Sequence, residues 1–286
     1  MTDQQPLSEA IYTPESQLKH PGRLINNMWN DLKASRGLAW RFFVRDISAR
    51  YRQTFLGYLW AFIPPVFTTL IFVFLTGKKL LNIDDTGIPY PVYVMLGTIL
   101  WYVFFEGVNS PIKIISGSKP MLTKINFPRE SLIIAALGEV IFNFIVRVLL
   151  IILILIWFKV PISTMIFLAP LGVLSLMLLG LMFGLLLTPL ALLYRDIEKG
   201  LPIILQIWFF LTPVIYPVPE SGAGAILNYV NPVTPVLNTC REMLTTGVIT
   251  RPGLFVLISS LTLILLVLGW VLYRLAMPHL IARIGA

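Results

Sequence analysis

The sequence predicts an all-helical, polytopic membrane protein with six transmembrane helices, and three observations lead to this prediction. Hydrophobic residues make up 57 % of the 286 residues and charged residues only 13 %, whereas a soluble domain has roughly 45–50 % apolar and about 25 % charged residues. The chain contains several apolar runs close to the about 20 residues that a helix needs to cross a bilayer. Most Lys and Arg residues lie between or beside these runs. This pattern excludes a soluble globular enzyme.

The first predicted span has no charged residue between Arg52 and Lys78. The six predicted spans are residues 54–77, 91–116, 131–158, 170–193, 201–216 and 254–273. The fifth is short, and Pro213 and Pro217 favour a break near its end. We therefore expect it to be tilted, kinked or continued by a segment that stays within the membrane.

The distribution of Lys and Arg predicts the orientation. Residues 1–53 carry eight of them, and the loops and tail on the same side add eight more. The opposite side carries five, and Arg147 lies inside a span. Because basic residues concentrate on the cytoplasmic side, we expect both termini in the cytoplasm. The net charge of +8 is then a topology signal, which argues against nucleic acid as a partner. The predicted organisation is a cytoplasmic tail (1–33), an amphipathic interface helix (34–53), a six-span domain (54–274) and a cytoplasmic C-terminal tail (275–286).

The predicted interface helix, residues 34–53, has an apolar stripe and a basic stripe at helical spacing. Tryptophan and arginine suit the headgroup layer of a membrane. Its key residues are Trp40, Arg41, Arg45 and Arg52. Two interpretations remain open: an anchor with no further role, or a helix that also contacts a cytoplasmic partner.

The inner loop, residues 117–130, is short and basic. Pro120 suits the first turn of a helix and Pro128 disfavours helical geometry at Phe127, so a brief helix between the two prolines is expected. Such a loop has the shape to dock into another protein. The plain alternative is a positively charged connection.

Charged residues occur at helical spacing inside two predicted spans. Glu106 and Lys113 share a face of the second span, and Glu139 and Arg147 share a face of the third. Charges at membrane depth are costly and mark either pairing or a pathway. We expect pairing between packed helices, with Glu139 meeting Lys113 and Arg147 meeting another polar group. A proton relay is the alternative.

The outer segment, residues 217–251, contains two short apolar stretches, 225–230 and 236–244, that prolines and glycines interrupt. Neither stretch is long enough to span a membrane. We therefore predict two short re-entrant or interfacial helices, which form an outer gate or a surface lid. Asn231, Pro232 and Arg241 are the candidate gate residues.

The sequence offers no catalytic or metal site. Cys240 is the only cysteine, and the two histidines, His20 and His279, lie near opposite ends of the chain. No Gly-x-x-x-x-Gly-Lys-Ser/Thr loop occurs, so nothing in this chain is expected to hold the phosphates of ATP.

Five stretches of the chain, in order along it, carry a resemblance to a known family. They are residues 45–60, the Phe-Pro-Arg-Glu at 127–130, the Tyr-Arg-Asp-Ile at 194–197, residues 210–216, and Asn231, Pro232 and Arg241. Together they resemble the membrane subunit of ABC-2-type exporters that carry lipid-linked polysaccharide, such as O-antigen, capsule or teichoic acid. The resemblance covers about residues 38–280.

The resemblance implies a homodimer in the inner membrane of a bacterium, with its two copies enclosing a channel. It also implies two copies of an ABC ATPase, which bind ATP and Mg²⁺, so that no cofactor belongs to this chain. A coupling helix in the inner loop is implied to transmit closure of the ATPase subunits. The coupling residues are then Lys119, Pro120, Thr123, Lys124, Phe127, Pro128, Arg129 and Glu130.

Aromatic side chains are the candidate lining of such a channel, because their faces pack against the apolar faces of sugar rings. A long glycan is expected to bind weakly at several positions along its path rather than tightly at one site. The candidates are Tyr58, Trp60, Trp101, Tyr102, Phe105, Trp208 and Phe209.

Two other functions stay open from the sequence. An ion-coupled secondary carrier would use Glu106, Glu139 and Arg147 and would need no ATPase, although such carriers often show two related halves, which are not visible here. A membrane transferase acting on lipid-linked sugars would need a carboxylate cluster, and Asp84 with Asp85 is the only adjacent acidic pair.

Overall fold

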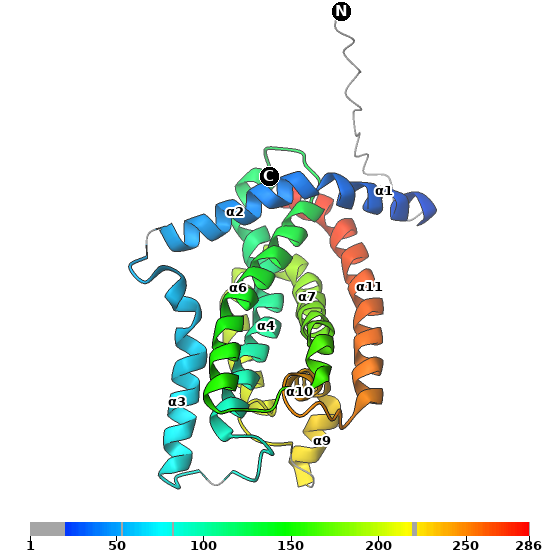
Figure 1. Cartoon of the computed structure of the whole chain (residues 1–286). Helices are drawn as coiled ribbons and strands as arrows, with labels where there is room; N and C mark the ends of the chain where they lie inside the picture. The colour runs from blue at the N-terminus through cyan, green and yellow to red at the C-terminus, as the bar shows by residue number, and fades with distance from the viewer. Residues whose placement is uncertain (1–20, 53, 82, 219–221, 286) are drawn as a thin grey trace, which may run out of the picture.

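The fold is a bundle of long helices with shorter helices across both of its ends (Figure 1). The computed structural model describes residues 21–52, 54–81, 83–218 and 222–285, and within them it contains helices and no strand. Four helices are long and apolar enough to cross a membrane. They are α4 (Tyr90–Gly117), α6 (Glu130–Trp157), α7 (Ala169–Leu193) and α11 (Pro252–Gly285). The prediction of an all-helical membrane fold is confirmed, with four of the six expected spans.

The other two predicted spans are shorter helices. The first span is divided into the 3-10 helix η2 (Gly57–Ala61) and the helix α3 (Ile63–Gly77). The fifth is α8 (Arg195–Leu211), whose first turns are charged. At 1.5 Å per residue, α3 and α8 are about 22 and 25 Å long, less than the roughly 30 Å of a hydrocarbon core. The count of six spans therefore stays a prediction.

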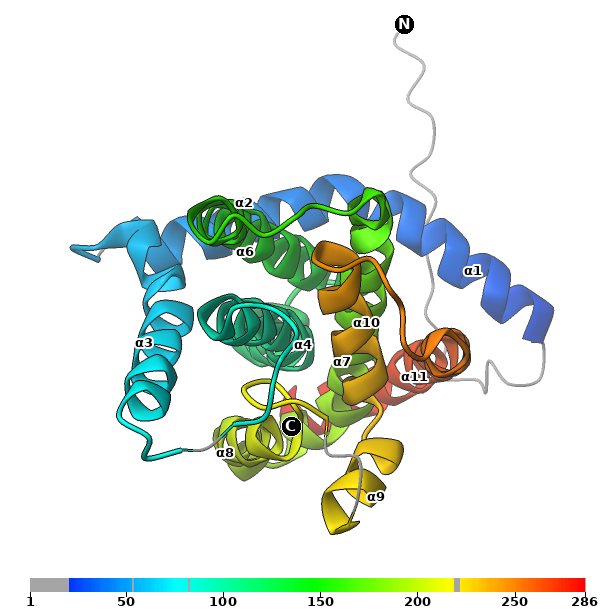
Figure 2. The same ribbon diagram turned by 60° about the horizontal axis from the view of Figure 1, so that its bottom comes forward.

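Helix α4 is the centre of the bundle. Figure 2 shows it surrounded by α3, α6, α7 and α8. It crosses α7 at small residues, since a Cβ on Gly180 would lie 2.5 Å from the carbonyl oxygen of Phe104 and one on Gly184 2.7 Å from that of Val108. Glycines at such a crossing let two helix backbones approach closely within a membrane. By contrast, α11 leaves apolar side chains such as Leu257 and Ile264 exposed, as a lipid-facing helix does.

Two helices lie across one end of the bundle, α1 (Pro21–Ala34) and α2 (Arg36–Arg52) (Figure 1). The predicted interface helix corresponds to α2. The structure differs from the expectation before it, because residues 21–33, assigned to a tail, belong to a helix of their own. Asp31 of this helix is ion-paired with Arg274 of α11, which holds α1 against the bundle. Residues 1–20 of the predicted tail lie outside the described residues.

The opposite end carries two short helices at the predicted positions, α9 (Gly222–Val230) and α10 (Val233–Leu244). Helix α10 packs against α4, α7 and α11, and its residues Leu237 and Cys240 are fully buried. A short 3-10 helix, η3 (Thr164–Leu168), leads into α7 beside α10. Whether α9 and α10 re-enter the membrane remains a prediction.

Candidate functional site

Arg147 is the centre of a buried charge pair between α4 and α6. Its guanidinium donates two hydrogen bonds to the carboxylate of Glu106, at 3.0 and 2.5 Å, and a third to the carbonyl oxygen of Ala61 at 3.2 Å. The ring of Tyr102 lies 5.1 Å from the guanidinium carbon. Arg147 is only 4 % exposed. The arginine thus has the polar partner that the sequence analysis expected, and that partner is the acidic residue of α4.

Glu139 is paired differently from the prediction. Its carboxylate accepts a hydrogen bond from the guanidinium of Arg50 on α2, and not from Lys113, which is exposed on α4. The pairing of Glu139 with Lys113 was therefore wrong. The reason is that α2 crosses the end of α6 and supplies the counter-charge from outside the two spans.

Glu106, Arg147 and Arg50 line an open cavity of about 370 Å³, where α2, η2, α4 and α6 meet. Trp60 and Asn143 complete its wall. Trp60 is 53 % exposed, and Tyr58, two residues earlier in η2, is 50 % exposed and in ring contact with Phe142. One of the predicted lining residues, Trp60, therefore lies beside the paired charges.

The predicted lining residues form two groups in the structure, one exposed or half-buried, to which Tyr58 and Trp60 belong, and one packed in the core. Tyr102 and Phe105 are half-buried and in ring contact at 5.8 Å, on the same helix as Glu106. Trp101 and Phe209 are buried, with ring centroids 5.7 Å apart, inside a cluster that also holds Phe104. Trp208 joins this cluster through Phe104 and Phe183. Within one chain, the rings of Trp101 and Phe209 therefore face the core.

The inner loop contains less helix than expected. Helix α5 (Lys119–Leu122) is a single turn, and the chain from Thr123 to Pro128 is irregular. Lys119 donates to the carbonyl oxygen of Leu192 at 3.1 Å, and the ring of Phe127 packs on Phe42 of α2 at 5.6 Å. Pro120, Thr123, Lys124 and Ile125 are exposed at the tip. The loop is thus fixed at both ends and exposed at its tip.

The last residue of the inner loop belongs to an ion network that the sequence analysis missed. Glu130 accepts a hydrogen bond from Arg274 at 2.7 Å, and the same guanidinium contacts Asp31 at 2.7 Å. Tyr273 donates to the carbonyl oxygen of Arg129 at 3.4 Å. The network joins α1, α6 and α11 beside the loop. Its members are far apart in sequence, and Arg274 had been counted only as a topology signal.

The interface helix exposes most of its predicted residues. Trp40 is 65 % exposed and Arg41 is exposed beside it. Arg45 is paired with Asp46 at 2.7 Å and lies over the ring of Phe42. The side chain of Arg52 lies outside the described residues.

The predicted gate residues hold an irregular segment that follows α8. Arg241 donates to the carbonyl oxygens of Pro213 and Val214, at 3.3 and 2.8 Å, and lies over the ring of Tyr93 at 3.7 Å. Asn231 accepts from the indole of Trp208 at 3.1 Å and donates to Thr212 at 2.8 Å. Pro232 precedes the first turn of α10.

These bonds explain how the fifth predicted span ends. Non-helical backbone at membrane depth is tolerated only when its polar groups are satisfied within the protein. The carbonyl oxygens of residues 214–216, in the irregular chain after α8, accept hydrogen bonds from Arg241, Tyr90 and Tyr93. Gly97 makes room for this contact, because a Cβ there would lie 2.2 Å from the Arg241 guanidinium and 2.3 Å from the Val214 carbonyl oxygen.

Within the described part of the chain, no group of three His, Cys, Asp or Glu side chains is arranged to hold a metal ion. The site is therefore one of ion pairs, aromatic rings and exposed loop surface.

Comparison with known proteins gives one consistent result. The family model described as "ABC-2 type transporter" matches residues 38–245. The "O-antigen export system permease protein RfbA" of Myxococcus xanthus is 28 % identical over 218 residues, which cover 74 % of this chain and 82 % of that protein. The "Polysialic acid transport protein KpsM" of Escherichia coli is 26 % identical over 239 residues, which cover 81 % and 90 %. A second RfbA, from Klebsiella pneumoniae, is 21 % identical over 207 residues, which cover 71 % and 78 %.

Proposed function

The chain belongs to the ABC-2 type transporter family, and we propose that it is the permease subunit of an ATP-driven exporter of lipid-linked polysaccharide. The observation that carries the proposal is the family match over residues 38–245 together with relatives named for O-antigen export and polysialic acid transport. These relatives align over most of their own length. The substrate class is therefore a glycan of the cell surface, carried on a lipid.

ATP and Mg²⁺ are bound by two copies of a separate ABC ATPase subunit. The absence of a phosphate-binding loop from the sequence supports this division of labour. The ATPase docks on the inner loop at residues 119–130, with α2 beside it. The exposed tip at Thr123, Lys124 and Ile125, fixed at its base by Lys119 and Phe127, supports this docking site.

The permease works as a homodimer, and α3 and α8 contribute to the contact or to the channel between the copies. Both helices leave large apolar side chains exposed, among them Phe67 and Phe74 on α3 and Ile203 on α8. Gln206 is exposed in the middle of α8. A polar side chain at that position is costly against lipid and is favoured against a second copy or a wet channel.

The glycan passes along the exposed aromatic rings beside the two ion pairs. Trp60 lines the cavity at Arg147, Tyr102 lies over the Arg147 guanidinium and contacts Phe105, and Tyr58 offers a further exposed ring two residues before Trp60. Stacking on aromatic faces is weak and tolerant of sequence along the glycan. The satisfied pairs Glu106–Arg147 and Glu139–Arg50 favour a structural role for these charges over an ion-coupled carrier.

The protein lies in the cytoplasmic membrane with both termini in the cytoplasm. The end of the bundle with α1, α2, α5 and the end of α11 is then the inner end, and α9 and α10 close the outer end when no glycan is present (Figure 1). The excess of Lys and Arg at the inner end supports this orientation.

The experiment removes the gene and measures the glycan at the cell surface with and without a plasmid copy. We expect loss of surface glycan and accumulation of lipid-linked glycan inside the cell, restored by the plasmid. Purified alone, the chain hydrolyses no ATP, and it supports hydrolysis in complex with the partner ATPase. Unchanged surface glycan in the deletion strain, or robust hydrolysis by the isolated chain, contradicts the proposal.

A further inference from the structure

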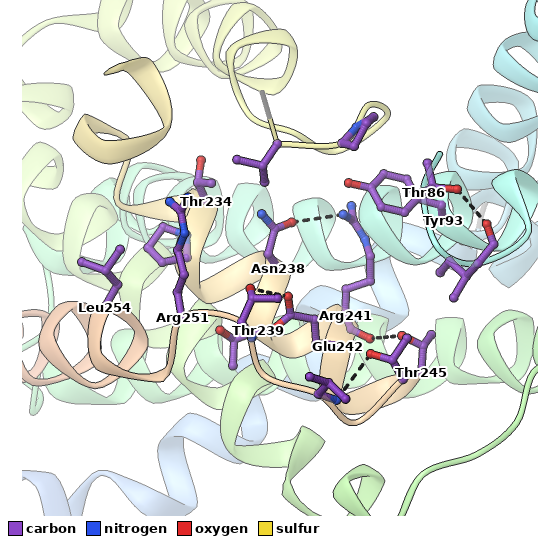
Figure 3. Close-up of a pocket in the computed structure, with 17 residues that line it drawn as sticks. Thr86, Tyr93, Thr234, Asn238, Thr239, Arg241, Glu242, Thr245, Arg251 and Leu254 are labelled. Atoms are coloured by element: carbon purple, nitrogen blue, oxygen red, sulfur yellow. Dashed lines mark hydrogen bonds between the residues drawn. The ribbon is translucent and has the colours of Figure 1, made fainter. Parts of the chain in front are cut away.

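A cavity of about 550 Å³ lies at the end of the bundle that carries α9 and α10 (Figure 3). Its walls come from α10, from the segment leading into α4, from the chain that follows α8 and from the loop after α10. It is separate from the cavity at Arg147, with which it shares no lining residue. Its volume lies in the range of about 300–1,000 Å³ that is typical of small-molecule sites.

The lining is rich in hydroxyl groups. Six threonines and one asparagine line the cavity: Thr86, Thr234, Thr239, Thr245, Thr246, Thr250 and Asn238. Pro217, Pro235 and Leu254 supply apolar surface between them. Hydroxyl and amide groups that alternate with apolar surface match the hydroxyl groups and the apolar faces of a sugar ring.

The charges of the lining leave a positive excess. The carboxylate of Glu242 is hydrogen-bonded to the loop after α10. It accepts from the backbone amide of Thr250 at 3.0 Å and from the hydroxyl of Thr250 at 2.7 Å. Arg241 is held by backbone carbonyl groups, and Arg251 lies over the ring of Tyr229 at 4.9 Å. Among the described residues, neither arginine is ion-paired with a carboxylate. The cavity therefore complements one negative charge.

Two buried polar atoms of the lining also lack a partner. The hydroxyl of Thr234 and Nε of Arg241 have no hydrogen bond within the described structure, although Thr234 and Arg241 are each only 4 % exposed. Most buried polar groups in proteins are hydrogen-bonded, so each of these atoms calls for a partner such as a bound water or ion. Both lie beneath the surface of the cavity, and they make this wall more polar.

We propose that the cavity binds one acidic sugar unit of the exported glycan after it leaves the bundle. Arginine recognises carboxylate and phosphate groups by charge-assisted hydrogen bonds, and Arg251 is the residue that meets the acidic group. The hydroxyl groups of Thr86, Thr245 and Thr250 donate within the chain. Thr239 and the amide of Asn238, whose oxygen also accepts from Arg241 at 3.1 Å, meet the hydroxyl groups of the same unit. The inference rests on the proposed export function and adds to it a site outside the path along the aromatic rings.

The test measures protection of an introduced cysteine in the purified full-length chain. Thr246→Cys places a reactive thiol in the exposed part of the cavity, and Ile162→Cys places a control thiol on an exposed loop at the same end of the bundle. Cys240 is fully buried and stays silent. The rate of maleimide labelling is compared in glucuronate, glucose and sulfate, at equal concentration and ionic strength. Val248→Cys, at an exposed apolar position of the lining, serves as a second reporter if Thr246→Cys folds poorly.

We expect glucuronate to slow labelling at Thr246→Cys several-fold, glucose to slow it less, and sulfate to leave it unchanged. Labelling of Ile162→Cys stays constant, and adding Arg251→Gln removes the protection by glucuronate. Equal protection by sulfate, equal protection by glucose, or no protection at either reporter overturns the proposal. Because surface glycan is measured separately, a failure here leaves the export function standing, and a failure of export leaves the binding result interpretable.

Discussion

Arg147 on α6 and Glu106 on α4 form a two-point ion pair, with Nη1 3.0 Å and Nη2 2.5 Å from the two carboxylate oxygens. The third donor of Arg147, Nε, reaches the carbonyl oxygen of Ala61. One buried cation therefore connects two long helices to the turn that precedes α3. In an environment of low dielectric constant, such a pair is stable only while both partners are present.

The first prediction follows from this mutual dependence. Arg147→Leu leaves the Glu106 carboxylate uncompensated, and we expect a loss of about 3–5 kcal/mol in stability with a fall in folded yield. Arg147→Leu combined with Glu106→Leu removes both charges and recovers much of the yield. Thermal unfolding in detergent and size-exclusion profiles measure the effect, and Lys113→Leu at an exposed position of α4 is the control. A well-folded Arg147→Leu protein without transport would instead favour a carrier that uses this charge.

The second prediction concerns Gly97, which faces Arg241 and the irregular chain after α8. We expect Gly97→Ala to destabilise the fold by at least about 1–3 kcal/mol, because the new methyl group overlaps both the guanidinium and the Val214 carbonyl oxygen. Gly200→Ala on α8 is the matched control, since nothing lies within 4 Å of its Cβ position. Folded yield and unfolding temperature are the measurements. Equal behaviour of the two variants would show that the Arg241 contact is looser than described.

Much of the fold follows from local patterns in the sequence. Four long apolar helices, the two short helices α9 and α10, and the helix α2 all correspond to apolar runs or amphipathic periodicity in the sequence. The helix α1 was missed because its polar composition resembles a tail, and Asp31 meets Arg274 only after folding. The short length of α8 was expected from Pro213 and Pro217, but the role of Arg241 in closing its end was not.

The candidate site was harder to predict because it depends on contacts over long sequence distances. The spacing of polar residues indicated that Glu106 and Arg147 each lie on a polar face of their helix. It does not indicate that the polar face of α4 packs against the polar face of α6. Glu139 finds Arg50, 89 residues away, because α2 folds back across the end of α6. Trp101 and Phe209 look like Tyr58 and Trp60 in the sequence, and only packing separates buried rings from exposed ones.

The third prediction uses Cys240 as a silent background for mapping the two sides of the membrane. Burial raises the pKa of this thiol to about 12, with Arg241 acting in the opposite direction. The reactive species is the thiolate, so the native protein stays unlabelled by maleimide at neutral and mildly alkaline pH. Thr123→Cys is exposed on the inner loop, and Ile162→Cys is exposed at the other end.

In whole cells, a membrane-impermeant maleimide is expected to label Ile162→Cys and to label Thr123→Cys only after the cells are opened. Crosslinks from Thr123→Cys to the ATPase, with none from Ile162→Cys, are expected in the assembled complex. The reverse pattern would place α9 and α10 in the cytoplasm and would invert the proposed orientation.

The fourth prediction separates the two groups of aromatic residues by what their loss affects. Trp101→Ala and Phe209→Ala remove buried rings that contact each other, so we expect a loss of about 3–5 kcal/mol in stability and a lower folded yield. Tyr58→Ala and Trp60→Ala remove exposed rings, and their effect on stability is expected within about 0.5 kcal/mol.

Export by the same four variants is expected to show the opposite order, with the larger effect per folded molecule at the exposed rings. If the glycan passes along the exposed rings, Tyr58→Ala and Trp60→Ala remove stacking contacts from its path. We then expect less surface glycan per folded protein molecule, while the partner ATPase keeps its activity. Trp101→Ala and Phe209→Ala lower surface glycan only in proportion to the folded protein that remains. Measuring surface glycan, protein level and ATPase activity on the same cultures distinguishes weaker contact with the glycan from a lower amount of folded protein. Unchanged export by well-expressed Tyr58→Ala and Trp60→Ala, singly and together, would assign these rings to the lipid interface, where exposed tyrosine and tryptophan are common, and would remove them from the channel.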